Sequence, residues 1–197
     1  DWGGSESYVD YEKMYLSRYK LLRKAYEKAD LKTDPDYAEF LKEEKDWLQD
    51  YCLFMAIKND QKGICWIDWP EELKDRHSKA VKEAEKELAE EIEFYRFQQY
   101  CFTTQWRKLK AYANKKDISI IGDVPIYVAL DSSDAWANPE MLQFDEDYDP
   151  KAVAGCPPDA FSATGQLWGN PLYDWKALKK DGYGWWVQRM THCLELY

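Results

Sequence analysis

The chain has 197 residues and carries 27 Lys and Arg against 37 Asp and Glu, which gives a net charge of −10. This acidic balance, with Lys interleaved among Glu, argues against the basic stripe of a nucleic-acid-binding surface. No apolar run approaches the ~20 residues that span a bilayer, and no charged-then-apolar leader opens the chain, so the sequence predicts a cytoplasmic protein without membrane partners.

The composition is rich in aromatic residues, with 10 Trp and 15 Tyr. This content excludes disorder and indicates either an aromatic core or platforms for carbohydrate. The two histidines, His77 and His192, lie in helical patterns, and we expect surface or packing roles for both. Five widely spaced cysteines show no CxxC pair, so we expect reduced, mostly buried thiols, no metal and no cofactor. They are Cys52, Cys65, Cys101, Cys156 and Cys193.

The first part of the chain predicts helices. Residues 8–29 place aromatic and aliphatic side chains at three- and four-residue steps, the pattern of an amphipathic helix. Asp34 and Pro35 predict the N-cap and first turn of a second helix, which should end near Asn59. After an aromatic connector, residues 70–115 predict one very long helix, charged in its first part and aromatic in its second.

The period changes at residue 117. Residues 118–128 are β-branched and apolar, which predicts a buried parallel strand after a helix. Asp123 follows Gly122 at the carboxyl end of this strand, where a (β/α) barrel builds its active site. A structural Asp that caps a turn is an equal alternative. Further on, residues 131–136 predict a short helix capped by Asp or Ser, and residues 174–197 a final helix divided at 181–184.

Residues 155–173 form the most distinctive segment, because aromatic rings, one carboxylate and side-chain amides alternate with Gly and Pro. These breakers disfavour a regular helix or a central strand and predict an irregular loop. Apolar ring faces beside hydrogen-bonding groups suit a sugar, which has C–H faces and a hydroxyl rim. The alternative is that the aromatics pack back onto their own core.

Two blocks resemble one known family. Residues 121–128 (Ile-Gly-Asp-Val-Pro-Ile-Tyr-Val), followed by Asp131, Ser132 and Trp136, resemble the first conserved block of the amylomaltases, the disproportionating 4-α-glucanotransferases of glycoside hydrolase family 77. Residues 153–173 are similar to that family's signature loop, and the helical first half, with Trp47 and its neighbours, resembles it too.

The resemblance implies an α/β fold that is part of a (β/α)8 TIM barrel with a large helical insertion. Residues 1–116 would be the helical region, and residues 117–197 a partial barrel with its third strand and the glucan-binding loop 155–173. It implies the transfer of α-1,4-glucan segments between maltodextrins by a retaining double displacement, which needs two carboxylic groups. The expected partners are α-1,4-glucans (maltodextrins, starch) and the remainder of the same polypeptide.

The family's nucleophilic Asp lies in an Arg-Ile-Asp-His-Phe-Arg-Gly-type block that this sequence lacks, so we expect a fragment without the catalytic nucleophile and acid/base, inactive alone. The alternatives are a non-catalytic α-glucan-binding module and a purely structural helical fragment. By resemblance, Asp123 is an active-site wall residue, and Ala160 stands where some relatives carry Tyr. The residues matching the substrate-binding loop are Pro158, Asp159, Phe161, Ser162, Gln166, Trp168, Asn170 and Tyr173, with Phe161 and Trp168 as ring faces and Asp159, Gln166 and Asn170 addressing hydroxyls.

Overall fold

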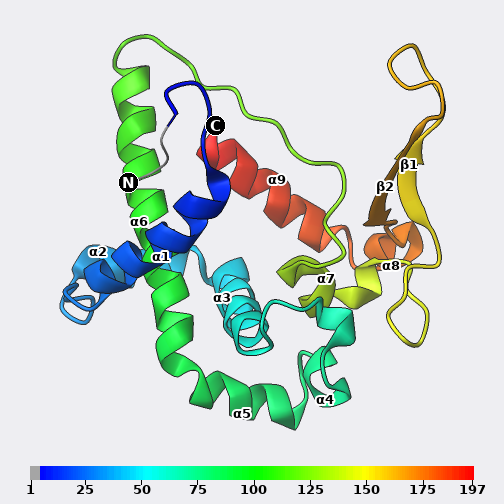
Figure 1. Cartoon of the computed structure of the whole chain (residues 1–197), viewed down its shortest axis with the longest axis horizontal. Coiled ribbons are helices and arrows are strands. Elements are labelled where there is room, and N and C mark those ends of the chain that lie inside the picture. Colours follow the sequence, from blue (N-terminus) through cyan, green and yellow to red (C-terminus); the bar gives the residue numbers. More distant parts are fainter. Residues whose placement is uncertain (1–4) are drawn as a thin grey trace.

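The computed structural model describes residues 5–197, so residues 1–4 of the expected helical region 1–116 lie outside it. Within the described residues the chain is mostly helical, and its sheet is a two-stranded antiparallel hairpin. Figure 1 shows the long helix α6 (Ala89–Asn114) along one side of the molecule and the hairpin projecting from the opposite side. The helical content of the first part of the chain is therefore confirmed.

Helix α1 (Tyr11–Tyr26) begins at Asp10, whose side chain accepts a hydrogen bond from the backbone N–H of Lys13. Only some of the apolar side chains that the sequence places along one face of this helix contact the core. Tyr26 packs against Phe94 and Phe97 of α6, with both pairs of ring centroids 5.6 Å apart. No α1 residue is fully buried, so this helix lies on the surface of the helical core.

Helices α2 (Pro35–Glu43) and α3 (Lys45–Asp60) replace the single helix that the sequence predicts between Asp34 and Asn59. The cap is confirmed, because the Asp34 carboxylate accepts from two backbone N–H groups of the first turn of α2. The prediction of one continuous helix, however, is wrong. Glu44 leaves the helical conformation (φ −95°, ψ 10°) and turns its buried carboxylate toward Trp47 Nε1, 2.7 Å away.

The single helix predicted for residues 70–115 is also wrong, because the chain forms α4 (Glu71–Lys74), α5 (Lys79–Glu87) and α6. Ser78 explains the main break. Its hydroxyl accepts from the backbone N–H of Val81 at 3.0 Å and donates to the carbonyl of Glu72 at 2.6 Å. This N-cap starts a new helix at a point where the charged composition alone gives no interruption.

Buried tryptophans join the helical part to the second half of the chain. Trp69 follows the short 3-10 helix η1 (Trp66–Asp68), and Trp136 lies in α7 (Ser133–Ala137). These two rings pack edge to face against each other with their centroids 5.9 Å apart, and the ring of Phe54 in α3 contacts both of them. Truncating a buried Trp or Phe costs about 3–5 kcal/mol, so this cluster is a principal link between the two halves.

Residues 118–128 do not form the predicted strand. They run extended from the end of α6 toward α7 (Figure 1), and Ile121 is 92% exposed. No second strand lies beside them in residues 5–197, and none of the backbone N–H groups of residues 119–131 donates to a backbone carbonyl of the described chain. A parallel strand forms only when a neighbouring strand supplies backbone hydrogen bonds. Residues 118–128 have the apolar pattern of a strand but no such neighbour in the part of the chain described, so they form no strand.

The predicted irregular loop contains a hairpin, β1 (Val153–Cys156) and β2 (Gln166–Pro171), so that prediction is wrong for these residues. A two-stranded sheet has only edge strands, where Gly and Pro are tolerated. Gly155 also allows a close approach, because a Cβ atom there would lie 2.5 Å from the carbonyl oxygen of Gln166. The breakers thus exclude a central strand but not this hairpin.

The C-terminal helix is divided as expected, into α8 (Trp175–Lys180) and α9 (Gly184–Leu196), with the 3-10 helix η2 (Pro139–Met141) packed near α8. The short helix at residues 131–136 is confirmed as α7, with Ser132 as its cap. All five cysteines are free. Only Cys52 is fully buried, contrary to the expectation of mostly buried thiols, and burial raises its pKa to about 12.

Candidate functional site

Asp159 organises the tip of the hairpin. Its Oδ1 atom accepts hydrogen bonds from the backbone N–H groups of Phe161 and Ser162, each at 2.8 Å. The Ser162 hydroxyl donates to the carbonyl of Gly165 at 2.7 Å, and Gly165 has a φ of +74°, which glycine adopts readily. Pro158 precedes this turn and is exposed. The tip therefore has a defined shape although it projects from the body of the molecule.

Two aromatic rings of the hairpin face solvent. Phe161 is 96% exposed at the tip, and Trp168 is 48% exposed on β2. The indole N–H of Trp168 donates to Gln166 Oε1 at 3.0 Å, and its ring lies 6.3 Å from that of Tyr127. Solvent-exposed ring faces beside fixed polar groups suit the C–H face and hydroxyl rim of a sugar.

The base of the hairpin contacts the extended segment. Asn170 Nδ2 donates to the carbonyl of Val128 at 2.9 Å, and the hydroxyl of Tyr173 donates to the carbonyl of Ile126 at 3.0 Å. The ring of Tyr173 is only 2% exposed and stacks on Tyr127 at 6.0 Å. Burial raises the pKa of Tyr173 above its ordinary value, which further favours the protonated hydroxyl that donates the hydrogen bond to Ile126.

Arg189 of α9 also binds the extended segment, next to Tyr173. Its guanidinium donates to the carbonyl of Pro125 at 2.6 Å and to the hydroxyl of Tyr173 at 3.4 Å. The same group lies over the rings of Trp185 and Trp186, 5.1 and 5.4 Å from their centroids. These cation–π contacts hold the guanidinium in one place.

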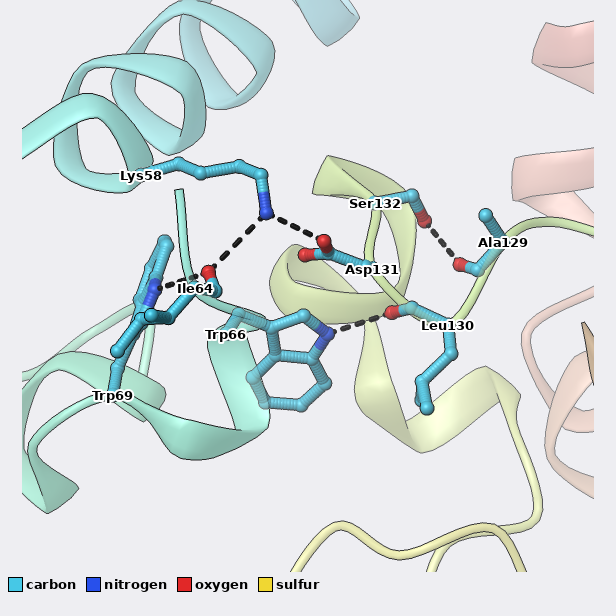
Figure 2. A network of polar contacts seen from close by, with 8 residues as sticks. All are labelled: Lys58, Ile64, Trp66, Trp69, Ala129, Leu130, Asp131 and Ser132. Atoms are coloured by element: carbon cyan, nitrogen blue, oxygen red, sulfur yellow. Dashed lines mark hydrogen bonds and ion pairs between the residues drawn. The ribbon is translucent and has the colours of Figure 1, made fainter. Parts of the chain in front are cut away.

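The end of the extended segment is bound from the helical side, as Figure 2 shows. Trp66 Nε1 donates to the carbonyl of Leu130 at 2.7 Å, and Ser132 Oγ donates to that of Ala129 at 2.7 Å. Lys58 of α3 forms an ion pair with Asp131 and also donates to the carbonyl of Ile64. Residues 125–131 are thus fastened to three distant parts of the chain.

Asp123 lies two residues before the first of these contacts and is exposed. The structure brings Trp168, Asn170 and Tyr173 to the segment that follows Asp123, whereas Asp159 and Phe161 lie in the turn that joins β1 to β2. The expected site residues therefore divide into a tip, with the exposed ring of Phe161, and a base, with the half-exposed ring of Trp168 and partly buried hydrogen bonds.

A cleft of about 590 Å³ lies elsewhere, between α3, α7 and α9. Glu44 and Trp47 line it from the helical side, with His192 and Trp185 opposite. The His192 ring lies 5.7 Å from that of Trp47, and its Nδ1 atom is 3.6 Å from the Glu44 carboxylate. None of the sequence-predicted site residues lines this cleft.

Neither a metal centre nor a membrane span is found in the part of the chain that the structure describes. No group of three or more His, Cys, Asp or Glu side chains in residues 5–197 is arranged to hold a metal ion. The helices of residues 5–197 also include none with the length and hydropathy that a bilayer crossing requires.

Sequence reasoning missed Arg189 and Tyr127, because one lies inside a helical pattern and the other inside an apolar run. One feature of the sequence could have indicated Arg189. It lies three residues after the Trp185–Trp186 pair, one helical turn away, where a guanidinium can lie over an aromatic ring. The contacts of Trp66 and Lys58 with the extended segment span more than 60 residues, and no local pattern predicts them.

Comparisons with known proteins point to one family. A family model described as 4-alpha-glucanotransferase matches residues 3–197. The chain is 46% identical over 198 residues to a 4-alpha-glucanotransferase of Clostridium butyricum, and 44% identical over 201 residues to one of Thermus thermophilus. Each alignment covers all of this chain but only 41% and 40% of the relative, respectively, so the chain spans about two fifths of the length of these proteins.

Solved structures agree. An amylomaltase from Streptococcus agalactiae in complex with acarbose superposes with a TM-score of 0.92 at 38% identity, covering 100% of this chain and 40% of that one. An amylomaltase from Corynebacterium glutamicum gives a TM-score of 0.63 at 20% identity, covering 86% and 22%. The second likeness shows the fold alone.

Proposed function

Because the chain belongs to the 4-alpha-glucanotransferase family, glycoside hydrolase family 77, we propose that it forms part of an enzyme that transfers α-1,4-glucan segments between maltodextrins. The names of the curated relatives, at about 45% identity, support this assignment. Since the chain spans only about two fifths of their length, the activity is that of a complete polypeptide to which these residues contribute.

The observation that carries the proposal is the pair of exposed rings on a shaped hairpin. Phe161 is almost fully exposed, and Trp168 keeps 48% of its surface exposed although its ring lies beside that of Tyr127. Asp159 shapes the tip beneath one ring, and Gln166 orients the other. Stacking on sugar rings gives such faces a function, and Pro158, Ser162 and the amide of Gln166 supply shape and polar groups around them.

The proposed chemistry is a retaining double displacement, in which one carboxylate attacks the anomeric carbon and a second group protonates the leaving oxygen. The second group then activates the acceptor hydroxyl. We assign both groups to the remainder of the polypeptide and Asp123 to the wall of the active site. A hairpin that covers the glucan favours a sugar acceptor over water by excluding solvent from the reacting centre.

Residues 118–128 would be a strand of a (β/α)8 barrel in the complete polypeptide, with residues 1–116 as the helical region and 117–197 as part of the barrel. The exposed side chains of Ile118, Ile121 and Ile126 support this placement, because a barrel strand buries such residues between helices and neighbouring strands.

The test is disproportionation of maltotriose by the complete polypeptide that carries this chain, followed by chromatography of longer maltodextrins. We expect transfer by the complete polypeptide and none by the 197-residue chain alone. Trp168→Ala should raise KM about two- to tenfold, the effect of losing roughly 0.5–1.5 kcal/mol of ring stacking. Tyr112→Ala, which removes an exposed ring of α6, is the matched control and should leave KM unchanged.

The exposed rings also favour a second candidate, an α-glucan-binding module without chemistry. Titration of maltoheptaose into the complete polypeptide, followed by Trp fluorescence, separates the two when it is combined with the maltotriose assay. Binding without any transfer would replace the enzyme assignment with the module. Transfer by the 197-residue chain alone would instead refute the placement of the catalytic carboxylates outside it.

A further inference from the structure

The extended segment after Asp123 is held through its carbonyl groups by side chains. Between residues 125 and 130, five carbonyls accept hydrogen bonds from side-chain donors. Three of these donors, Asn170, Tyr173 and Arg189, come from the base of the hairpin and from α9. They bind the carbonyls of residues 128, 126 and 125, at 2.9, 3.0 and 2.6 Å.

These donors are interlocked. The hydroxyl of Tyr173 donates to the segment and accepts from Arg189, and the guanidinium of Arg189 lies over Trp185 and Trp186. Tyr173 is 2% exposed, so its ring has no face left for a sugar. Its hydroxyl and the side-chain amide of Asn170 donate to the carbonyls of Ile126 and Val128, which lie three and five residues after Asp123.

We propose that Asn170, Tyr173 and Arg189 are positioning residues: together they clamp residues 125–128 to the base of the hairpin and thereby set Asp123 relative to the sugar-facing rings. The inference rests on the transferase function proposed above and deepens it. It gives Asn170 and Tyr173 a role different from the direct substrate contact that the family resemblance implies, and it adds Arg189.

The clamp has a direct consequence for the reaction. Phe161 lies at the tip of the hairpin and Trp168 lies on β2, whereas Asp123 lies on the extended segment, and the base contacts connect the hairpin to that segment. Displacing a positioned group by about 1 Å can reduce a rate by up to a hundredfold without removing any substrate contact. Loss of a clamp bond should therefore reduce kcat, whereas loss of a sugar contact should raise KM.

The experiment uses the complete polypeptide with Tyr173→Phe, which removes only the hydroxyl. The matched control is Tyr100→Phe, which removes a tyrosine hydroxyl that donates to Asp34 at 2.8 Å within the helical region. We expect Tyr173→Phe to lower kcat for maltotriose about tenfold with KM within about twofold. Tyr100→Phe should leave both unchanged.

Hydrogen exchange provides a readout that does not depend on activity. Amides of residues 121–128 should exchange faster in Tyr173→Phe and in Arg189→Met than in the parent protein. Arg189→Lys, which keeps the charge, should restore part of the protection. Tyr100→Phe should leave this segment unaffected.

The outcomes separate the clamp from the function on which it rests. A raised KM or a lost affinity for maltoheptaose, with kcat intact, would make Tyr173 a sugar ligand and overturn the proposal, as would unchanged kinetics and exchange. If the unsubstituted polypeptide transfers no glucan, the proposed function fails. In that case hydrogen exchange alone tests the clamp. Faster exchange of residues 121–128 in Tyr173→Phe supports the clamp, and unchanged exchange overturns it.

Discussion

Glu44 is a charged side chain inside the helical core, and its partners explain how it is tolerated. Its carboxylate is 7% exposed, accepts from Trp47 Nε1 at 2.7 Å and lies 3.4 Å from the Arg107 guanidinium. A buried charge is costly unless it is paired and hydrogen-bonded. The neighbouring Glu43 also pairs with Arg107, at 2.8 Å, but its side chain is 43% exposed.

We expect Glu44→Ala to lower the free energy of unfolding by about 2–3 kcal/mol, because it removes charge-assisted hydrogen bonds and leaves the indole N–H of Trp47 without its acceptor. Glu43→Ala should cost less than about 1 kcal/mol, since an exposed ion pair contributes little. Urea denaturation followed by helical circular dichroism measures both. Equal losses for the two variants would contradict the distinction.

At the scale of elements, helix caps and the Gly-marked break between α8 and α9 are readable from the sequence, whereas breaks without Gly or Pro are not. Asp34 and the cap of α7 are found where their residue types and spacing predict them. The breaks at Glu44 and Ser78 depend on partners elsewhere, Trp47 with Arg107 and the carbonyl of Glu72. Local periodicity contains no information on such contacts, so it predicts two continuous helices where five form.

The hairpin shows the same limit. Gly and Pro correctly exclude a central strand, but the pairing of β1 with β2 depends on turn geometry around Asp159 and Gly165. The aromatic composition predicts a sugar-facing segment. It does not distinguish the exposed Phe161 and Trp168 from Tyr173, which is equally aromatic and 2% exposed.

Gly165 allows a direct test of the hairpin tip. A Cβ atom there would lie 2.5 Å from the carbonyl oxygen of Cys156, in addition to the strain at φ +74°. Gly165→Ala should therefore open the tip and increase the rate of proteolytic cleavage within residues 157–164 several-fold, while the melting temperature of the helical core stays within about 2 °C.

Gly169→Ala is the matched control for this element. Gly169 has a φ of +80° but open space where the Cβ atom would stand, so it shares the backbone strain without the collision. Cleavage that increases as much in Gly169→Ala as in Gly165→Ala would show that the close approach to Cys156 contributes nothing to the tip.

For the whole molecule, most apolar side chains around α3 are buried, whereas most of those of the extended segment are not. Residues of α3 such as Leu53 and Ala56 are fully buried, whereas Ile118, Ile121 and Ile126 are exposed. The sequence correctly identifies the segment as apolar and β-branched. Strand formation, however, requires a neighbouring backbone, and no strand pairs with these residues in the described part of the chain.

This difference predicts two exchange behaviours within one chain. Side chains occupy several carbonyls of residues 125–130, but the N–H groups of residues 119–128 have no backbone acceptor among residues 5–197. In the 197-residue chain alone these amides should exchange at nearly the rate of an unprotected peptide, while those of Leu53, Phe54 and Ala56 in α3 remain protected. In the complete polypeptide, pairing with neighbouring strands of the barrel should slow the amide exchange of residues 119–128 by about a hundredfold or more. Strong protection of residues 119–128 in the isolated chain would show that this segment does not need the partner strands we propose.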